Sequence, residues 1–197
     1  MDINSIKAYI KSPYFKFILK FSILLFLWFF FYHFIYKIDE LIFSSQNADK
    51  IDLLNNISVI LAEQANYMLS LFGFETQIEI HKDMVVAKIL DNNYTHGVWI
   101  GEPCNGVKIF GVFAIFILAF PGRIKHKLWY IPLGIICIHI INVIRIAILI
   151  FISSVNPHIL DFNHNITFQI IVYSLILFLW YIWVKIFSGL KTNNLDV

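Results

Sequence analysis

Residues 128–152 read LWYIPLGIICIHIINVIRIAILIFI, and this stretch decides the class of the fold. It is an apolar run of helix length, and about 20 apolar residues suffice for a helix to cross the hydrocarbon core of a bilayer. Arg145 lies inside the run. A permanent charge at membrane depth is costly, so an arginine there is a functional-site hypothesis by default. The stretch therefore predicts a transmembrane helix that carries part of a functional site.

The composition of the whole chain points to the same class of protein. Of its 197 residues, 59% are hydrophobic and 14% are charged, whereas a soluble domain carries about 25% charged residues. The net charge of +2 is small, and the basic residues flank apolar runs without forming a patch. This distribution argues against nucleic-acid binding. The two cysteines fall in different predicted helices, which indicates two thiols rather than a disulfide framework.

Three further apolar runs predict helices at about residues 17–36, 106–120 and 166–187, and the second of these is the shortest. Basic residues precede the first run, fill the turn between 106–120 and 128–152, and follow the last run. The positive-inside rule places all three groups in the cytoplasm, and four spans make that placement self-consistent. These basic residues are Lys7, Lys11, Lys16, Lys20, Arg123, Lys125, Lys127, Lys185 and Lys191.

The run at residues 17–36 has one alternative interpretation, a cleaved signal peptide, because basic residues followed by an apolar stretch are its signature. However, the run continues through Trp28 and the bulky aromatic residues 29–32 and has no small-residue cleavage site at its end. We therefore expect an uncleaved membrane anchor.

The segment between the first two spans, residues 37–103, is expected outside the cytoplasm. Apolar residues at near-helical spacing between 53 and 72 predict an amphipathic helix on the outer leaflet or packed on the bundle. A fifth crossing by residues 51–73 is the alternative, and it would invert the topology of everything after it. Residues 77–100 alternate between short apolar runs and turn-like polar groups, which predicts a small β-hairpin or a three-stranded meander. The expected fold is an all-α polytopic membrane protein of about four transmembrane helices, with an extracytoplasmic amphipathic helix and a small β-hairpin.

Three reactive side chains are predicted to share one membrane face. Arg145 lies 17 residues into its run, about 25 Å along a helix and so near the outer interface. Cys104 immediately precedes the second span and His164 the last one, both outside. Asn142 is one helical turn before Arg145 and shares its face. Pro103 and Gly106 suggest a tight start to the second span, where a helix N-terminus would favour the thiolate of Cys104.

Each of these residues alone has a simpler explanation. Cys104 could be an inert buried thiol, Arg145 could extend to lipid phosphates, and His164 could be a solvated loop histidine. Their coincidence at one depth favours catalysis. A cysteine nucleophile, a histidine base and an arginine that stabilises an oxyanion make a complete set for acyl transfer.

The same motifs resemble a known family. CNG at residues 104–106 opening one span, NVIR at 142–145 near the end of the next, and His164 before the last are similar to the motifs of the exosortase/archaeosortase family of membrane transpeptidases. The short chain and the string EPCNG at residues 102–106 look most like the compact exosortase F branch. The resemblance covers about residues 101–183. Many relatives carry Ser after the cysteine, where this chain has Asn105.

The resemblance implies a Cys–Arg–His set in which Cys104 is the nucleophile and Arg145 and His164 are its partners. It also implies a substrate: exported proteins with a C-terminal sorting signal, which is a short motif followed by a transmembrane tail and basic residues. The expected enzyme is a cysteine peptidase or transpeptidase of the bacterial inner membrane, with its site on the extracytoplasmic face. The substrate motif and the acceptor nucleophile are left open. The supporting residues are Asn142, Glu102, Asn105, Gly106 and Asp161, of which Glu102 and Asp161 would be acidic neighbours of the arginine.

The expected organisation has four parts. Residues 1–36 hold the cytoplasmic N-terminus and the first anchor, residues 37–103 the extracytoplasmic helix and hairpin, residues 104–187 the catalytic three-helix core, and residues 188–197 a cytoplasmic tail. No cofactor or metal is expected, because the histidines lack a ligand cluster at one depth. The partners are the exported proteins and the lipid bilayer.

Two other functions fit the residues. The first is a protein that binds lipid head groups or anions through Arg145 and Asn142, with Cys104 incidental. The second is a non-catalytic membrane subunit whose polar groups fix helix packing.

Overall fold

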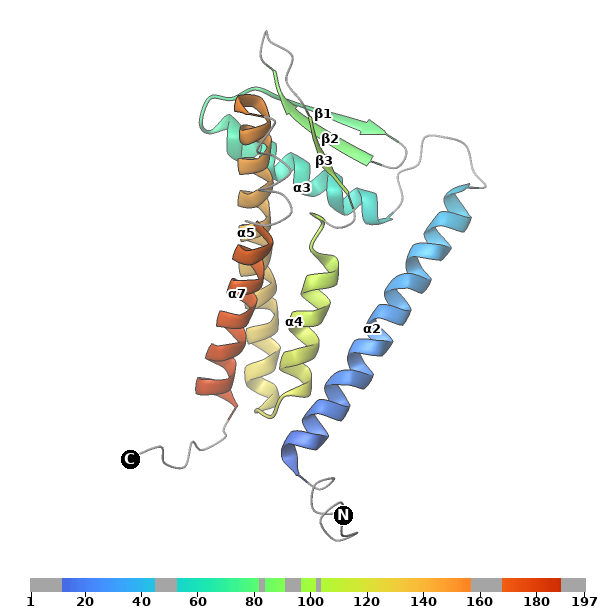
Figure 1. The fold of residues 1–197 in the computed structure, drawn as a ribbon, viewed down its shortest axis with the longest axis vertical. Coiled ribbons are helices and arrows are strands. Elements are labelled where there is room, and N and C mark those ends of the chain that lie inside the picture. The colour runs from blue at the N-terminus through green and yellow to red at the C-terminus, as the bar shows by residue number, and fades with distance from the viewer. Residues whose placement is uncertain are drawn as a thin grey trace. The chain divides into compact units, whose positions relative to one another are not determined.

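The computed structural model describes residues 12–44, 53–81, 84–90, 97–101, 104–156 and 168–188. Its elements, labelled as in Figure 1, are α2 (Pro13–Ser44), α3 (Leu53–Ser70), β1 (Thr76–His81), β2 (Met84–Ile89), β3 (Val98–Ile100), α4 (Val107–Ala119), α5 (Ile124–Val155), α7 (Phe168–Ile182) and the π-helical turn η4 (Trp183–Phe187). They form two compact units. The first contains the described residues of 1–33, 108–136 and 176–197, and the second those of 34–107 and 137–175.

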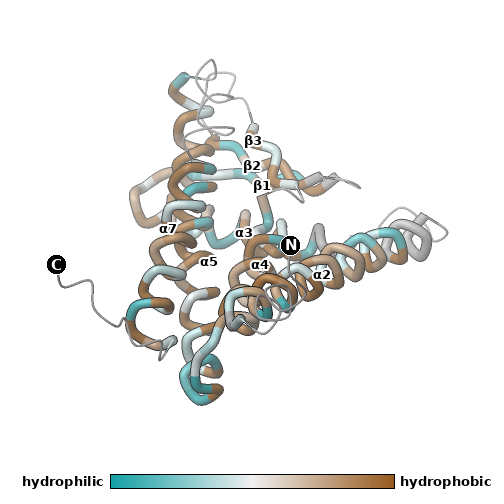
Figure 2. The backbone as a smooth tube through the Cα atoms, turned by 60° about the horizontal axis from the view of Figure 1, so that its bottom comes forward, coloured by the Kyte–Doolittle hydropathy of each residue, from teal (hydrophilic) through white to brown (hydrophobic). Residues whose placement is uncertain are grey.

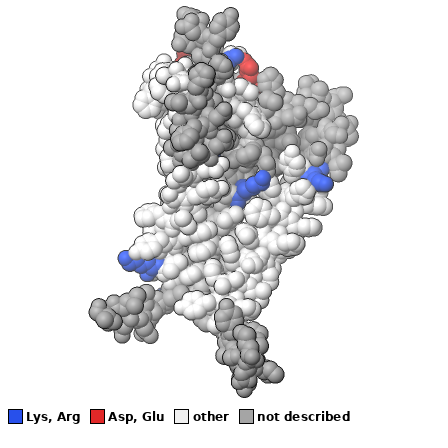
Figure 3. Space-filling model, in the orientation of Figure 1, with Lys and Arg blue, Asp and Glu red and all other residues white. Residues whose placement is uncertain are grey.

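Three segments are long and apolar enough to cross a membrane, namely Tyr14–Ile38 in α2, Ile124–Val155 in α5, and Gln169–Phe187 in α7 and η4. The α4 helix is apolar but shorter. Figure 2 shows hydrophobic residues along most of these helices, and Figure 3 shows few charged side chains among the described residues of one face. A helix that is apolar all round suits lipid or a protein interior. The predicted class is confirmed, and the chain is a multi-pass helical membrane protein.

In the first unit, helices approach closely at glycines. A Cβ added to Gly111 would lie 2.1 Å from Cε2 of Trp28, and one added to Gly134 would lie 2.2 Å from Cζ of Phe113. Small residues at such contacts let helix backbones pack closely in a membrane. The ring of Phe116 stacks on Trp180 with centroids 4.1 Å apart.

Two of the predicted cytoplasmic lysines meet at the C-terminal end of α4. Nζ of Lys20, from α2, donates to the carbonyl of Leu118 at 3.0 Å. Nζ of Lys127, from α5, donates to the same carbonyl at 3.0 Å and to that of Phe120 at 2.7 Å. Lysines satisfy the last carbonyls of a helix and interact favourably with its dipole. Basic residues from α2 and α5 therefore gather at one end of α4.

The second unit contains a three-stranded antiparallel sheet in the order β1-β2-β3. Ile78 pairs with Ala87, and Val86 pairs with Trp99. Alternate residues of β2 and β3 are buried, and α3 lies along one face of the sheet (Figure 1). The buried residues of α3 follow helical spacing and are Ser58, Leu61, Ala62, Ala65 and Leu69. The predicted amphipathic helix and strand meander are confirmed, and among the described helices α3 is not one that could span a membrane.

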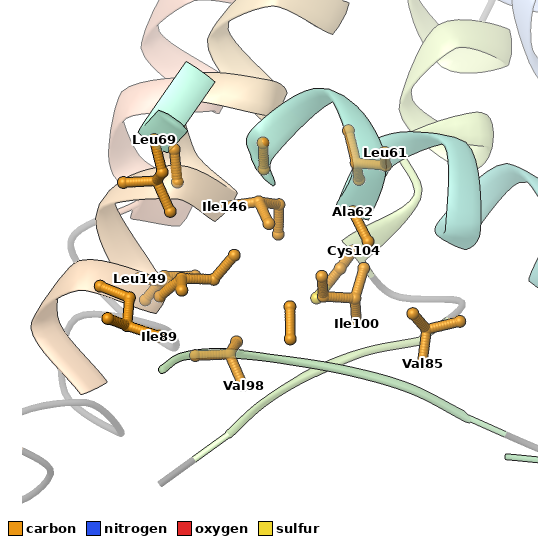
Figure 4. Close-up of a cluster of buried hydrophobic side chains, with 14 residues drawn as sticks. Leu61, Ala62, Leu69, Val85, Ile89, Val98, Ile100, Cys104, Ile146 and Leu149 are labelled. Carbon is orange, nitrogen blue, oxygen red and sulfur yellow. The ribbon is translucent and has the colours of Figure 1, made fainter. Parts of the chain in front are cut away.

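The core of this unit joins α3, the sheet and the second half of α5. Ile146, Leu149 and Ile150 of α5 pack in one cluster with buried residues of α3, β2 and β3. Cys104 belongs to the same cluster, and Figure 4 shows it beside Ile100. The cluster therefore brings the start of α4 against the segment of α5 that carries Asn142 and Arg145.

Candidate functional site

The start of α4 is a tight turn built by the CNG motif. The Cys104 N–H donates to the carbonyl of Gly101 at 2.9 Å. Oδ1 of Asn105 accepts the Val107 N–H at 3.1 Å, a local bond that asparagine favours at helix starts. Gly106 has φ +79°, a left-handed conformation that glycine adopts without steric cost. Each residue of the motif thus has a structural role, and the predicted tight helix start is confirmed.

Asn142 ties α5 to this turn. Its Nδ2 donates to the backbone carbonyl of Cys104 at 2.7 Å, and the bond is buried. Asn142 is only 4% exposed. Because a buried carbonyl without a partner costs about 1–3 kcal/mol, this bond holds the cysteine backbone in place.

Arg145 lies one turn beyond Asn142. It follows the first residue of α5, Ile124, by 21 residues, a rise of roughly 32 Å that matches the thickness of the hydrocarbon core. Arg145 is only 7% exposed, and its Nε is buried without a hydrogen-bond partner among the described residues. A side chain that extended to lipid phosphates would leave the protein interior. The observed burial instead directs the guanidinium into the protein.

The electrostatics of Cys104 differ from the expectation. The side chain is 3% exposed, and this burial raises the pKa of the thiol above its usual value. The charge of Arg145 lowers the pKa, and a backbone hydrogen bond with Gly101 lowers it further, but burial is the largest of these effects. The prediction that the helix start favours the thiolate is therefore wrong for this structure. Burial favours the neutral thiol, and the proton must be removed for the sulfur to react.

A second polar pair accompanies the site. Nε2 of His139 lies 2.8 Å from Oε1 of Gln64, so α5 is also bonded to α3. Three polar residues of α5 follow one another at a spacing of three: His139, Asn142 and Arg145. At this spacing, each residue shares a side of the helix with the next one. His139 was not among the residues predicted to form the site. The three-residue spacing is the signal that could have joined it to the others.

Five of the eight predicted site residues lie in the described part of the second unit, and the structure brings them together: Cys104, Asn105, Gly106, Asn142 and Arg145. Glu102, Asp161 and His164 lie outside the described residues. Cys104 and Cys137, both described, are not joined by a disulfide. In the part of the chain that the structure describes, no three His, Cys, Asp or Glu side chains gather as a metal site would require.

Comparison with known proteins gives one match. The sequence model of the transmembrane exosortase family matches residues 16–183, which is most of the chain. The match is to the family and not to one branch of it. No curated protein and no solved structure matches the chain. Because the match includes the apolar helices, the sheet and the polar cluster, the chain belongs to the transmembrane exosortase family.

Proposed function

We propose that this protein is a cysteine transpeptidase or protease that cleaves a C-terminal sorting signal from exported proteins. Membership of the exosortase family supports a transpeptidase-type role in general. The observation that carries the specific proposal is the buried guanidinium of Arg145, which acts electrostatically on the Cys104 thiol and has an unpartnered Nε. A buried donor whose charge acts on the thiol suits a reaction in which negative charge develops on a carbonyl oxygen.

The proposed reaction begins when His164 accepts the thiol proton of Cys104. The sulfur then forms a bond to the carbonyl carbon of the scissile peptide, and the π electrons move to the oxygen, where Arg145 stabilises the charge. When the intermediate collapses, the C–N bond breaks and the leaving amine takes the proton from His164. The exported protein is left as a thioester on Cys104. An amine acceptor or water then attacks this thioester and releases the thiol.

The other site residues would position Cys104 and Arg145. Asn142 holds the backbone of Cys104, and Gly106 permits the turn that starts α4. Glu102 and Asp161 are the acidic residues proposed to neighbour Arg145, since a guanidinium away from water is stabilised by a carboxylate.

We place the site on the extracytoplasmic face of the bacterial inner membrane. The basic residues Lys20 and Lys127 bind carbonyls at the C-terminal end of α4. Cys104 precedes the other end of this helix, which has 13 residues and rises about 20 Å. If the basic end is cytoplasmic, as the positive-inside rule requires, the cysteine belongs to the outer side.

Capture of the thioester tests the proposal. Membranes from cells that express the chain should contain a covalent adduct between it and an exported protein, and neutral hydroxylamine should release that adduct. Cys104→Ser should remove the hydroxylamine-sensitive adduct, whereas Cys137→Ser, the matched control at the other cysteine, should keep it. An adduct that survives Cys104→Ser and still yields to hydroxylamine would refute the assignment.

One other function draws on the same observation. A buried arginine with an unpartnered Nε could also bind a phosphate group, as in a lipid-head-group binder. If the protein binds lipid head groups, Cys104→Ala should have no effect on the phenotype of the cell. If it is the proposed enzyme, Cys104→Ala should give the same phenotype as deletion of the gene.

A further inference from the structure

Buried side-chain nitrogens without hydrogen-bond partners are few among the described residues, and they divide between the two units. The ring nitrogens of Trp28, His126, Trp180 and Trp183 belong to the first unit. The other two are Nδ2 of Asn105 and Nε of Arg145, both in the unit that holds Cys104. Because folded proteins satisfy nearly all buried polar groups, each such atom needs an explanation.

The orientation of the Asn105 amide is fixed by the backbone. Its Oδ1 accepts the Val107 N–H at 3.1 Å, and this bond decides which end of the amide is oxygen and which is nitrogen. Nδ2 is therefore the end that is left without a partner. Asn105 is only 2% exposed and directly follows Cys104 in the sequence, so its donor is buried in the turn that carries the thiol.

A purely structural role would not require this donor. The turn uses only the side-chain oxygen of Asn105, which accepts the Val107 N–H. The unused amide of Asn105 is thus unexplained by the turn and points to an acceptor that the substrate supplies.

We propose that Asn105 is a catalytic residue whose Nδ2, together with Nε of Arg145, donates to the oxygen of the scissile carbonyl as negative charge develops on it. This inference rests on the proposed function. Both donors keep their protons throughout: the oxygen gains the π electrons when the C–S bond forms and returns them when the C–N bond breaks. Donors already oriented before reaction stabilise the charge without reorganisation.

The test compares two small thiol reagents on the full-length protein in membranes, in a Cys137→Ser background so that Cys104 is the cysteine that reacts. Para-nitrophenyl acetate acylates the thiol through a tetrahedral oxyanion. Methyl methanethiosulfonate transfers a thiomethyl group to sulfur and forms no oxyanion. A change in thiolate fraction alters both rates equally and cancels in the ratio of the acylation rate to the thiomethylation rate, so a fall in this ratio reports weaker stabilisation of the oxyanion.

Asn105→Asp keeps the acceptor for Val107 and removes the donor. Loss of one oxyanion donor typically lowers a rate by about a hundred- to a thousandfold, so the ratio should fall at least about tenfold. Asn56→Asp, which adds the same charge at an exposed position of α3, should leave the ratio unchanged. A ratio for Asn105→Asp within about twofold of the parent would overturn the inference.

A second variant keeps the test decisive if the aspartate variant fails to accumulate. Asn105→Ala carries no charge and has no side-chain donor, so the ratio should again fall, and an unchanged ratio again overturns the inference. Failure of the proposed function has a different signature, because Cys104→Ser would then leave sorting-signal cleavage intact. If the ratio is unchanged but sorting-signal cleavage still requires Cys104, only the proposed role of Asn105 is refuted.

Discussion

Replacement of Arg145 by lysine separates two effects that the guanidinium combines. Lysine keeps the positive charge that lowers the pKa of the Cys104 thiol, so the rate of thiomethylation should stay within about threefold of the parent. It cannot supply the planar donor fork, of which the buried Nε is the part without a partner. A lost oxyanion donor corresponds to about 2.7–4 kcal/mol, a factor of roughly a hundred to a thousand in rate. We therefore expect Arg145→Lys to cleave substrate at least about tenfold more slowly, a cautious lower bound on that range.

The assay is a time course of sorting-signal cleavage at matched membrane levels of the parent and Arg145→Lys proteins. Protease resistance of the membrane-embedded chain provides the control for folding. If the lysine variant is folded and cleaves at the parental rate, charge alone suffices at this position. The argument from the buried Nε would then be refuted, and Arg145 would be interpreted as a membrane anchor.

Three further changes test the geometry of the site. Asn142→Ala removes the 2.7 Å hydrogen bond to the carbonyl of Cys104. It should lower the free energy of unfolding by about 1–3 kcal/mol, measured by thermal denaturation in detergent. Unchanged stability would mean that the carbonyl finds another partner. Gly106→Ala places a Cβ at φ +79° and should cost about 1–2 kcal/mol in the same assay, and a stabilised variant would contradict the turn. In intact cells, a charged, membrane-impermeant methanethiosulfonate should label Cys104 and spare Cys137. Because burial raises the pKa of Cys104, the labelling rate should still increase with pH at about pH 9. In Arg145→Met, which loses the charge that lowers this pKa, the increase should extend to higher pH. Labelling only after permeabilisation would reverse the topology, and a rate that levels off near neutral pH would contradict the raised pKa.

The helices could be predicted from the sequence because their signal is local. The apolar runs at residues 17–36 and 128–152 lie within α2 and α5, which extend further at both ends. Hydropathy marks where a helix is apolar, but a helix continues through polar residues as long as its backbone bonds are made. The α3 helix and the strands β2 and β3 were also predictable, since each shows the periodicity of one buried face.

The environment of Cys104 could not be predicted in the same way. A helix start close in sequence suggested a low thiol pKa, whereas burial among residues of α3, the sheet and α5 raises the pKa of the thiol. That burial depends on packing between segments far apart in the chain. The contact of Asn142 with the carbonyl of Cys104 spans 38 residues and is likewise tertiary, although the shared face of Asn142 and Arg145 was visible in their spacing.

The most direct test of the central claim is the fate of the cleaved tails when Cys104 alone is changed. The chromosomal copy is replaced by Cys104→Ser or by the matched control Cys137→Ser, and quantitative mass spectrometry of membranes measures peptides from the C-terminal transmembrane tails of exported proteins. The account predicts that exported proteins keep these tails in the Cys104→Ser strain and lose them in the parent and in the Cys137→Ser strain, at equal levels of the three proteins. Equal processing in all three strains would contradict the claim that Cys104 is the nucleophile.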